Sequence, residues 1–472
     1  MRYKTTVAAT IISLTLFAAN TRAIDLKYSF GPQPLPGYTH VKPDDTYSPD
    51  KGYGFDLASK VKLVDRAGNE PSLAGFVTGQ DNKPFLFSAK LAPGVYRVTV
   101  TLGDSTGEAT TTVKSETRRL MLESVTTAPG EVKSYSFLVH VRVPQIPESA
   151  GGGVVSFKPR ERDPILFIWE GAAMLAFKEL DWDEKLTLEF SDRNPCLDSI
   201  EITDAQNPTT VYLVGDSTMT DQMMEPWAGW GMMLPRFFNE PLVVANYAEC
   251  GESAASFISE KRWPKLLSEI HKGDYVFIQF GINDQGMRGG APAFKQLFER
   301  YVDDTLAHGA IPVLVTSQNL RRSLGADGKA VQTLRDFPDA MRQVAKEKNV
   351  ALIDLNAMSM TLYEAEGMEG LKHFFVEGTH QQDYGAYELC KCVVQGIIDD
   401  KLPIAAYLTA DFKYFDPAKP DKFEDFHMPQ DPQLDPARPG GPGAPNGQGA
   451  MAAPRATPRA ARGTTRPTTR AN

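Results

Sequence analysis

Residues 211–218 read VYLVGDST, and this stretch decides the fold of the larger part of the chain. A short apolar run rich in β-branched residues leads directly into a turn opened by Gly215, which predicts a buried strand followed by a loop. Ser217 therefore follows the carboxyl end of a strand. A nucleophilic serine needs such an exposed hydroxyl close to a backbone donor, so Ser217 is a candidate nucleophile. The predicted role of Asp216 is structural, bonding amides of the neighbouring loop.

Four further apolar runs follow the first one, and segments of helical period separate them. The runs are residues 243–245, 275–280, 311–315 and 351–355, and the helical segments include 294–308 and 338–348. Strands that alternate with helices predict an α/β fold with a parallel sheet covered on both faces, here over residues 208–412. Because ligands of such sheets bind at the carboxyl ends of strands, we look for chemistry directly after each apolar run.

The region before this sheet has a different character. Residues 24–207 contain short strand-like segments punctuated by Gly and Pro, which predicts an antiparallel β-sandwich. The predicted strands include residues 95–102, 134–143, 165–169 and 186–190.

The two ends of the chain differ from its body in composition. Residues 1–23 combine a basic start with an apolar run at 7–19 and end on a small residue, which predicts a cleaved export signal and a periplasmic or extracellular location. Residues 413–429 are predicted to be a linker. Residues 430–472 are rich in Pro, Gly, Ala, Thr and Arg without an aromatic residue, which predicts a disordered tail.

Charge and cysteine content limit the classes of function. The net charge is −9, and every acidic residue lies between the basic ends 1–23 and 438–472, which argues against nucleic acid as the partner. No stretch after the amino-terminal run is apolar enough to span a membrane, so no membrane partner is expected. The four cysteines are expected to be buried thiols rather than a disulfide framework or a metal pair. They are Cys196, Cys250, Cys390 and Cys392.

Polar residues follow the second and third predicted strands and lie in a loop far downstream. Gly251 could bring a backbone N–H to an oxyanion, and Asn283 offers a side-chain amide donor. His380 lies in the loop 377–380, which reads EGTH, and a general base for a serine must be an imidazole oriented by a carboxylate. Glu377 can supply that carboxylate, whereas Asp383 is expected to cap the helix that follows.

These four blocks, taken in order, resemble the SGNH (GDSL-type) hydrolases over about residues 210–400. The matching residues are Ser217, Gly251, Asn283 and His380. More narrowly, the motifs are similar to those of rhamnogalacturonan acetylesterases, family 12 of the carbohydrate esterases. Residues 25–205 resemble the galactose-binding-like domain that precedes the catalytic domain in some bacterial members.

The resemblance implies a fold, a reaction and roles for the site residues. The fold is a flavodoxin-like, doubly wound sheet of five parallel strands. The reaction is removal of acetyl groups from pectic polysaccharide through an acyl-enzyme, with no metal and no cofactor. Ser217 would be the nucleophile and His380 the base oriented by Glu377. Ser217, Gly251 and Asn283 would form the oxyanion hole.

The chain departs from the family pattern at two positions. Glu377 stands where Asp is common, and Ile282 stands where His is common, before Asn283. Because of Glu377, a carbohydrate-binding protein with an inactive hydrolase domain is an alternative to an active esterase. Ile282 changes a contact with the substrate or a contact that supports the site. Acetylxylan or another acetylated glycan is an alternative substrate, and a lipid esterase or thioesterase is a third possibility. Arg321 and Arg322 follow the fourth strand and could pair with galacturonate carboxylates, or be solvated loop residues.

Overall fold

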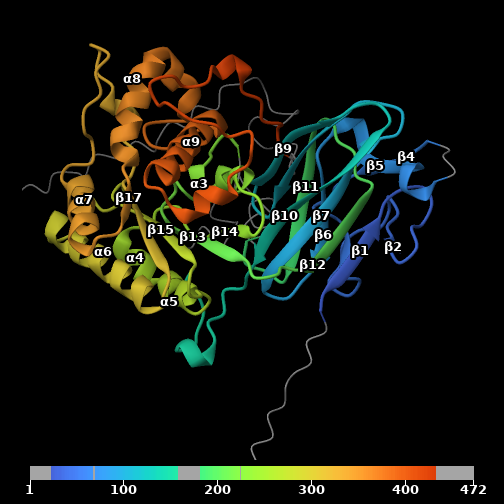
Figure 1. Cartoon of the computed structure of the whole chain (residues 1–472), viewed down its shortest axis with the longest axis horizontal. Helices are drawn as coiled ribbons and strands as arrows, with labels where there is room; N and C mark the ends of the chain where they lie inside the picture. The colour runs from blue at the N-terminus through green and yellow to red at the C-terminus, as the bar shows by residue number, and fades with distance from the viewer. Residues whose placement is uncertain (1–22, 67–69, 158–180, 224, 432–472) are drawn as a thin grey trace, which may run out of the picture.

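The computed structural model describes residues 23–66, 70–157, 181–223 and 225–431, which form two units side by side (Figure 1). The first unit consists of mainly antiparallel sheets, and the second has a parallel sheet between helices. The predicted export signal falls on residues outside the described ranges, apart from Ala23. The predicted strand at 165–169 and residues 432–472 of the predicted tail also lie outside them.

Two five-stranded sheets form the amino-terminal β-sandwich. Their orders are β10-β7-β12-β1-β2 and β3-β6-β11-β8-β9, and β1–β2 is the parallel pair among otherwise antiparallel neighbours. Phe30, Phe87 and Val98 are among the side chains buried between the two sheets, which confirms the predicted sandwich. The strands are β1 Asp25–Ser29, β2 Thr39–His40, β3 Tyr53–Asp56, β6 Phe85–Lys90, β7 Gly94–Asp104, β8 Ala109–Ser115, β9 Arg119–Thr127, β10 Glu131–Val141, β11 Lys185–Asn194 and β12 Ser199–Asp204, with a separate ribbon of β4 Val61–Asp65 and β5 Gly75–Gly79.

The second unit contains a sheet of five parallel strands in the order β14-β13-β15-β16-β17. Numbered along the chain, this order is 2-1-3-4-5, the flavodoxin-like arrangement, so the predicted fold class is confirmed. The strands are β13 Thr209–Gly215, β14 Leu242–Asn246, β15 Tyr275–Gln279, β16 Ile311–Val315 and β17 Ala351–Ile353.

Alternate residues of each strand supply the two hydrophobic layers above and below this sheet. On β13, Val211 and Leu213 pack into one cluster, and Tyr212 and Val214 into the other, as the period of two requires. The first cluster includes side chains of α3, α8 and α9, and the second includes side chains of α4 to α7. The helices are α3 Trp230–Met233, α4 Ala254–Ser259, α5 Arg262–Leu267, α6 Gly290–Ala307, α7 Phe337–Lys348, α8 Leu355–Phe374 and α9 Asp383–Asp399.

Helix α8 is the main element that the sequence reading did not predict. The fifth apolar run was expected to continue to residue 355, but β17 ends at Ile353 and Leu355 begins α8. The Asp354 carboxylate accepts a hydrogen bond from the Ala357 N–H and so starts the helix at this point. Gly367, with φ 64° and ψ 179°, interrupts the helical dihedrals, which weakens the periodicity that would reveal the helix.

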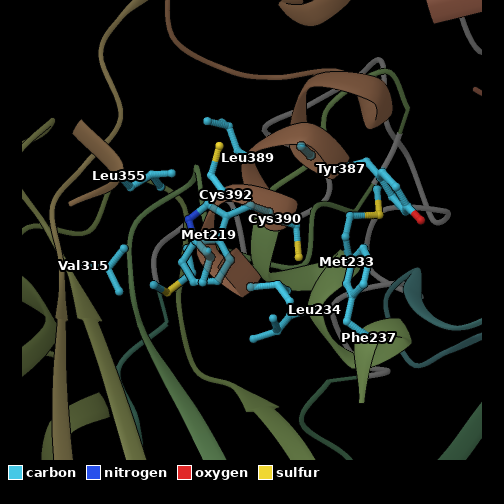
Figure 2. Close-up of a cluster of buried hydrophobic side chains, with 14 of the residues drawn as sticks. Met219, Met233, Leu234, Phe237, Val315, Leu355, Tyr387, Leu389, Cys390 and Cys392 are labelled. Carbon is cyan, nitrogen blue, oxygen red and sulfur yellow. The ribbon is translucent and has the colours of Figure 1, made fainter. Parts of the chain in front are cut away.

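Cys390 and Cys392 lie in α9 with their sulfur atoms among apolar side chains (Figure 2). Both thiols are buried, as is Cys196, and the four cysteines form no disulfide with one another. Burial raises the pKa of the Cys390 thiol well above its ordinary value, which keeps it protonated. Three of the four cysteines therefore match the expectation of buried thiols, whereas Cys250 is only partly buried.

The segment after α9 packs against both units, in contrast to the linker expected for residues 413–429. Phe415 is buried in the hydrophobic cluster of α9, and Phe426 and Met428 pack against the same cluster. Asp431, which the sequence placed in a disordered tail, is buried and forms ion pairs with Lys114 and Arg118 of the sandwich. The composition of this segment did not reveal its packing, because composition counts apolar residues. It cannot show that Lys114 and Arg118 of the sandwich lie beside Asp431 in the fold.

Candidate active site

The loop after β13 holds Ser217 in a crowded position. A Cβ at Gly215 would lie 2.9 Å from the Gln279 carbonyl oxygen and 2.8 Å from the Met219 sulfur, so only glycine fits there. The Asp216 carboxylate accepts hydrogen bonds from the Thr218 N–H at 3.0 Å and the Thr218 hydroxyl at 2.7 Å. Asp216 thus has the structural contacts that the sequence predicted, and they shape the turn that presents Ser217.

His380 lies between Ser217 and Glu377. Its Nε2 atom is 2.8 Å from Ser217 Oγ, and its Nδ1 atom contacts the Glu377 carboxylate. When Nδ1–H donates to Glu377, Nε2 is left as an acceptor for the serine hydroxyl proton. The predicted contact of Glu377 with the imidazole, and of the imidazole with Ser217, is therefore present in the structure.

Glu377 is held by its own loop. Its two carboxylate oxygens also accept hydrogen bonds from the Thr379 and His380 N–H groups, each at 2.9 Å. Burial raises the pKa of Glu377, but these bonds and the His380 side chain outweigh burial and lower the pKa to about 2. The carboxylate is thus ionised at neutral pH and able to stabilise an imidazolium.

Backbone hydrogen bonds fix the loop that carries His380. The Val376 N–H donates to the His380 carbonyl at 2.9 Å and closes the loop at its base. The Ala228 N–H donates to the Gln381 carbonyl at 2.9 Å and ties the loop to the segment that follows Ser217. These contacts define where the imidazole lies relative to the serine.

Gly251 and Asn283, the other oxyanion candidates, lie on adjoining loops. The Asn283 side-chain amide donates to the carbonyl of Glu252, the neighbour of Gly251, at 2.8 Å. An amide nitrogen has two hydrogens, so this bond leaves Asn283 a second donor. Gly251 has φ 72°, a conformation that favours glycine, which lets the loop turn sharply at this point.

Two residues that sequence reasoning missed connect these loops. The Gln222 side-chain amide donates to the Ser217 carbonyl at 2.6 Å, and the Cys250 sulfur lies 3.4 Å from the Gln222 side-chain oxygen. The Asp284 carboxylate accepts from the Ala254 and Gly281 N–H groups at 2.9 and 3.0 Å. Asp284 follows Asn283 directly, so its place beside a candidate residue was the signal available in the sequence.

Arg321 and Arg322 lie next to the loop of His380. The Arg321 N–H donates to the Gly378 carbonyl at 3.0 Å, which places the start of the short helix η6, Arg321–Ser323, beside Glu377 and His380. Arg322 is exposed and Arg321 partly buried.

The described ranges hold neither a metal-binding cluster nor a membrane-spanning helix. No group of three or more His, Cys, Asp or Glu side chains there is arranged to hold a metal ion. No described helix combines the length and the apolar character needed to cross a bilayer.

A serine, a histidine and a carboxylate in a hydrogen-bonded chain, on a 2-1-3-4-5 parallel sheet, have the arrangement of a serine hydrolase. The chain belongs to the GDSL-like Lipase/Acylhydrolase family, whose sequence model matches residues 213–382. A second model, described as Beta-agarase/YXIM esterase-like, galactose-binding domain-like, matches residues 26–132 in the sandwich.

Three curated proteins illustrate the similarity. Rhamnogalacturonan acetylesterase RhgT of Bacillus subtilis is 38% identical over 43% of this chain and 96% of its own length. Uncharacterized esterase YxiM of the same species is 26% identical over 80% of this chain and 92% of its own length, so its alignment extends beyond the hydrolase unit. Rhamnogalacturonan acetylesterase of Emericella nidulans is 24% identical over 45% of this chain and 94% of its own length.

Proposed function

We propose that this chain is a serine carboxylic ester hydrolase that removes acetyl groups from pectic polysaccharide of the rhamnogalacturonan class. The observation that carries the proposal is the contact of His380 with both Ser217 and Glu377. The 38% identity to RhgT across nearly all of that protein supports the choice of substrate.

The reaction proceeds through an acyl-enzyme. Ser217 Oγ attacks the acetyl carbonyl carbon while His380 Nε2 takes the hydroxyl proton. His380 then gives this proton to the sugar oxygen as the bond between that oxygen and the carbonyl carbon breaks. A water molecule attacks the acetyl-serine, its proton passes to His380, and acetate leaves as the proton returns to Ser217.

Glu377 and the oxyanion donors lower the energy of the charged states. Glu377 fixes the imidazole tautomer and stabilises the imidazolium formed in each half-reaction. The N–H groups of Ser217 and Gly251 and the second amide hydrogen of Asn283 bind the oxyanion. Glu replaces Asp at 377 without loss of the contact, because its two backbone hydrogen bonds turn the longer side chain toward the ring.

The substrate assignment is tested by measuring acetate released from acetylated rhamnogalacturonan, acetylated xylan and a small chromogenic acetate. The proposal expects the highest kcat/KM for acetylated rhamnogalacturonan and loss of all release in Ser217→Ala. A preference for xylan would move the assignment to another acetylated glycan. Binding of pectin without release of acetate would identify a carbohydrate-binding protein, and a preference for long acyl chains a lipid esterase.

We also propose that the protein is exported to the periplasm or the cell exterior. The basic start and the apolar run of residues 1–23 support this location. Mass determination of the protein from the medium or periplasm should give an amino terminus at Ile24. An intact amino terminus in a cytoplasmic fraction would contradict it.

A further inference from the structure

Arg118, the last residue of the turn between β8 and β9, and Arg119, the first residue of β9, lie between the sandwich and the hydrolase unit. Arg118 is 2% exposed and Arg119 is 1% exposed. Burial of a guanidinium costs several kcal/mol unless its donors are paired. Arg119 is paired with Asp221, and its nitrogen atoms lie 2.7 and 3.0 Å from the same carboxylate oxygen.

Arg118 contacts three separate segments of the chain. Its Nη1 atom donates to the Trp227 carbonyl at 2.7 Å and the Gln222 carbonyl at 3.2 Å, both in the segment that follows Ser217. Its Nη2 atom donates to the Asp383 carboxylate at 3.1 Å. Its Nε atom forms an ion pair with Asp431. One planar guanidinium therefore joins segments that lie far apart in the sequence.

Two of these segments directly follow the proposed nucleophile and base in the chain. Gln222, whose carbonyl accepts from Arg118, donates through its side chain to the Ser217 carbonyl. Asp383 is the first residue of α9 and lies three residues after His380. It makes no capping bond within α9, which corrects the expectation that it caps the helix, and its carboxylate faces Arg118 instead.

Carboxylates from both units surround Arg118: Glu189 comes from the sandwich, and Glu225, Asp383 and Asp431 come from the other unit. Burial raises the pKa of Asp383, and the Arg118 cation offsets this only in part. Burial also raises the pKa of Asp431, but Arg118 and Lys114 outweigh burial and leave it below the ordinary value. Loss of the Arg118 charge would remove the larger of two cation effects on Asp383 and leave the smaller one of Lys114.

We propose that Arg118 is a positioning residue for the reaction, because it clamps the segment after Ser217 to the start of α9 and so sets the distance between Ser217 and His380. The sandwich is then a part of the catalytic unit rather than an independent binding module. This inference rests on the proposed ester hydrolysis, and its test separates the two.

The test compares four variants of the full chain. Arg118→Met removes the clamp, Arg118→Lys restores the charge without the planar fork, and Arg118→Met with Asp383→Asn removes the cation together with its carboxylate on α9. Glu123→Gln is the matched control, because Glu123 of β9 pairs with Arg236 and Tyr387 across the same interface but contacts neither loop of the site. Each variant is assayed for kcat and KM on a small acetate ester.

We expect kcat of Arg118→Met to fall about 10- to 100-fold with KM within about twofold, since a displacement of about 1 Å in the reacting groups has such an effect. Arg118→Lys should recover part of the loss. The double variant should be more stable than Arg118→Met but no faster. Glu123→Gln should keep the wild-type kcat. Wild-type kcat in folded Arg118→Met, or an equal loss in Glu123→Gln, would overturn the proposal.

A second measurement keeps the inference distinct from the proposed function. The rate at which a fluorophosphonate labels Ser217 reports the serine–histidine pair whatever the natural substrate is. Slower labelling of Arg118→Met, with no acetate ester hydrolysed by the wild type, would support the role of Arg118 and refute the esterase. Equal labelling rates in the wild type and Arg118→Met would refute the role of Arg118 alone.

Discussion

The loop 377–380 and the β8–β9 turn differ in how far apart along the chain their interacting residues lie. Glu377 contacts an imidazole three residues away, whereas Arg118 contacts a carboxylate 265 residues away. The first can be read from spacing in one loop, because a short loop lets two nearby side chains converge.

The second kind of contact depends on how two units pack. No pattern around Arg118 distinguishes it from a solvated turn arginine, since its partners come from the segment after Ser217, from α9 and from the end of the described chain. The reacting groups of this protein are therefore encoded locally in the chain, whereas the contacts that support them join residues far apart in sequence.

The largest effect on turnover is expected from replacing Ser217, the proposed nucleophile that His380 contacts. Ser217→Ala removes the only group of the mechanism that can form the acyl-enzyme, so turnover should fall by about 10⁴- to 10⁶-fold. Acetate release from a small ester measures the loss, and circular dichroism checks that the fold is kept. Wild-type turnover in this variant would show that Ser217, His380 and Glu377 do not carry out the reaction.

Glu377 tests whether the three-residue spacing is functional. Glu377→Gln leaves the side chain in place but removes the charge that stabilises the imidazolium, so kcat should fall about 10³- to 10⁴-fold. Glu377→Asp keeps the charge and shortens the reach, so its loss should be about 10- to 100-fold. A fully active Glu377→Gln variant would mean that another acid, or none, orients His380.

The ion pairs of Asp431 with Lys114 and Arg118 can be tested by measuring the stability of the protein to unfolding. Deletion of residues 432–472 should leave the unfolding midpoint unchanged, whereas deletion of 430–472 removes the buried partner of Lys114 and Arg118. Loss of one member of a buried ion pair costs about 3 kcal/mol or more, so the shorter chain should unfold at lower denaturant concentration. Chemical denaturation of both chains gives the comparison, and Asp431→Asn in the full chain isolates the carboxylate. Equal midpoints would show that the packed end is dispensable.

Replacing Arg321 and Arg322 tests whether these side chains bind an acidic substrate. Alanine at both positions should raise KM for an acidic pectic polymer by about 3- to 30-fold, because exposed ion pairs contribute modestly. The KM for a small uncharged acetate should stay the same. The difference should shrink as salt is added, since salt screens exposed charges. An equal change in KM for both substrates would show that the arginines support the loop instead.

The smallest effect is expected at Asp284, whose raised pKa should make the stability of the fold depend on pH. Burial is the largest cause that raises its pKa to about 7, above the ordinary value of 3.8. The folded state therefore holds a proton that the unfolded state releases, so this contribution to stability is complete below about pH 4 and is lost as pH rises toward about 7. The free energy of unfolding of the wild type should therefore fall relative to that of Asp284→Asn as pH rises across this range. Curves that stay parallel would contradict the shift.

Much of the catalytic unit could be predicted because its signals are local. The apolar run before Ser217, the repeated runs of the other strands and the period of α6 and α7 each lie within one short segment. Helix α8 was missed because Gly367 breaks its dihedrals and its pattern. The connections through Gln222 and Asp284 were missed because they join residues from different loops.

The sequence alone predicts the five strands of the parallel sheet and their alternation with helices, the candidates Ser217, His380 and Glu377, and the acyl-transfer chemistry that these residue types can perform. It could do so because strand and helix periods and short-loop spacing are local properties. Only the tertiary structure decided that the segment at 413–431 packs against both units and that Arg118 reaches the start of α9. The physical reason is that a buried charge is tolerated only beside its partner, and that partner is brought near by folding rather than by sequence position.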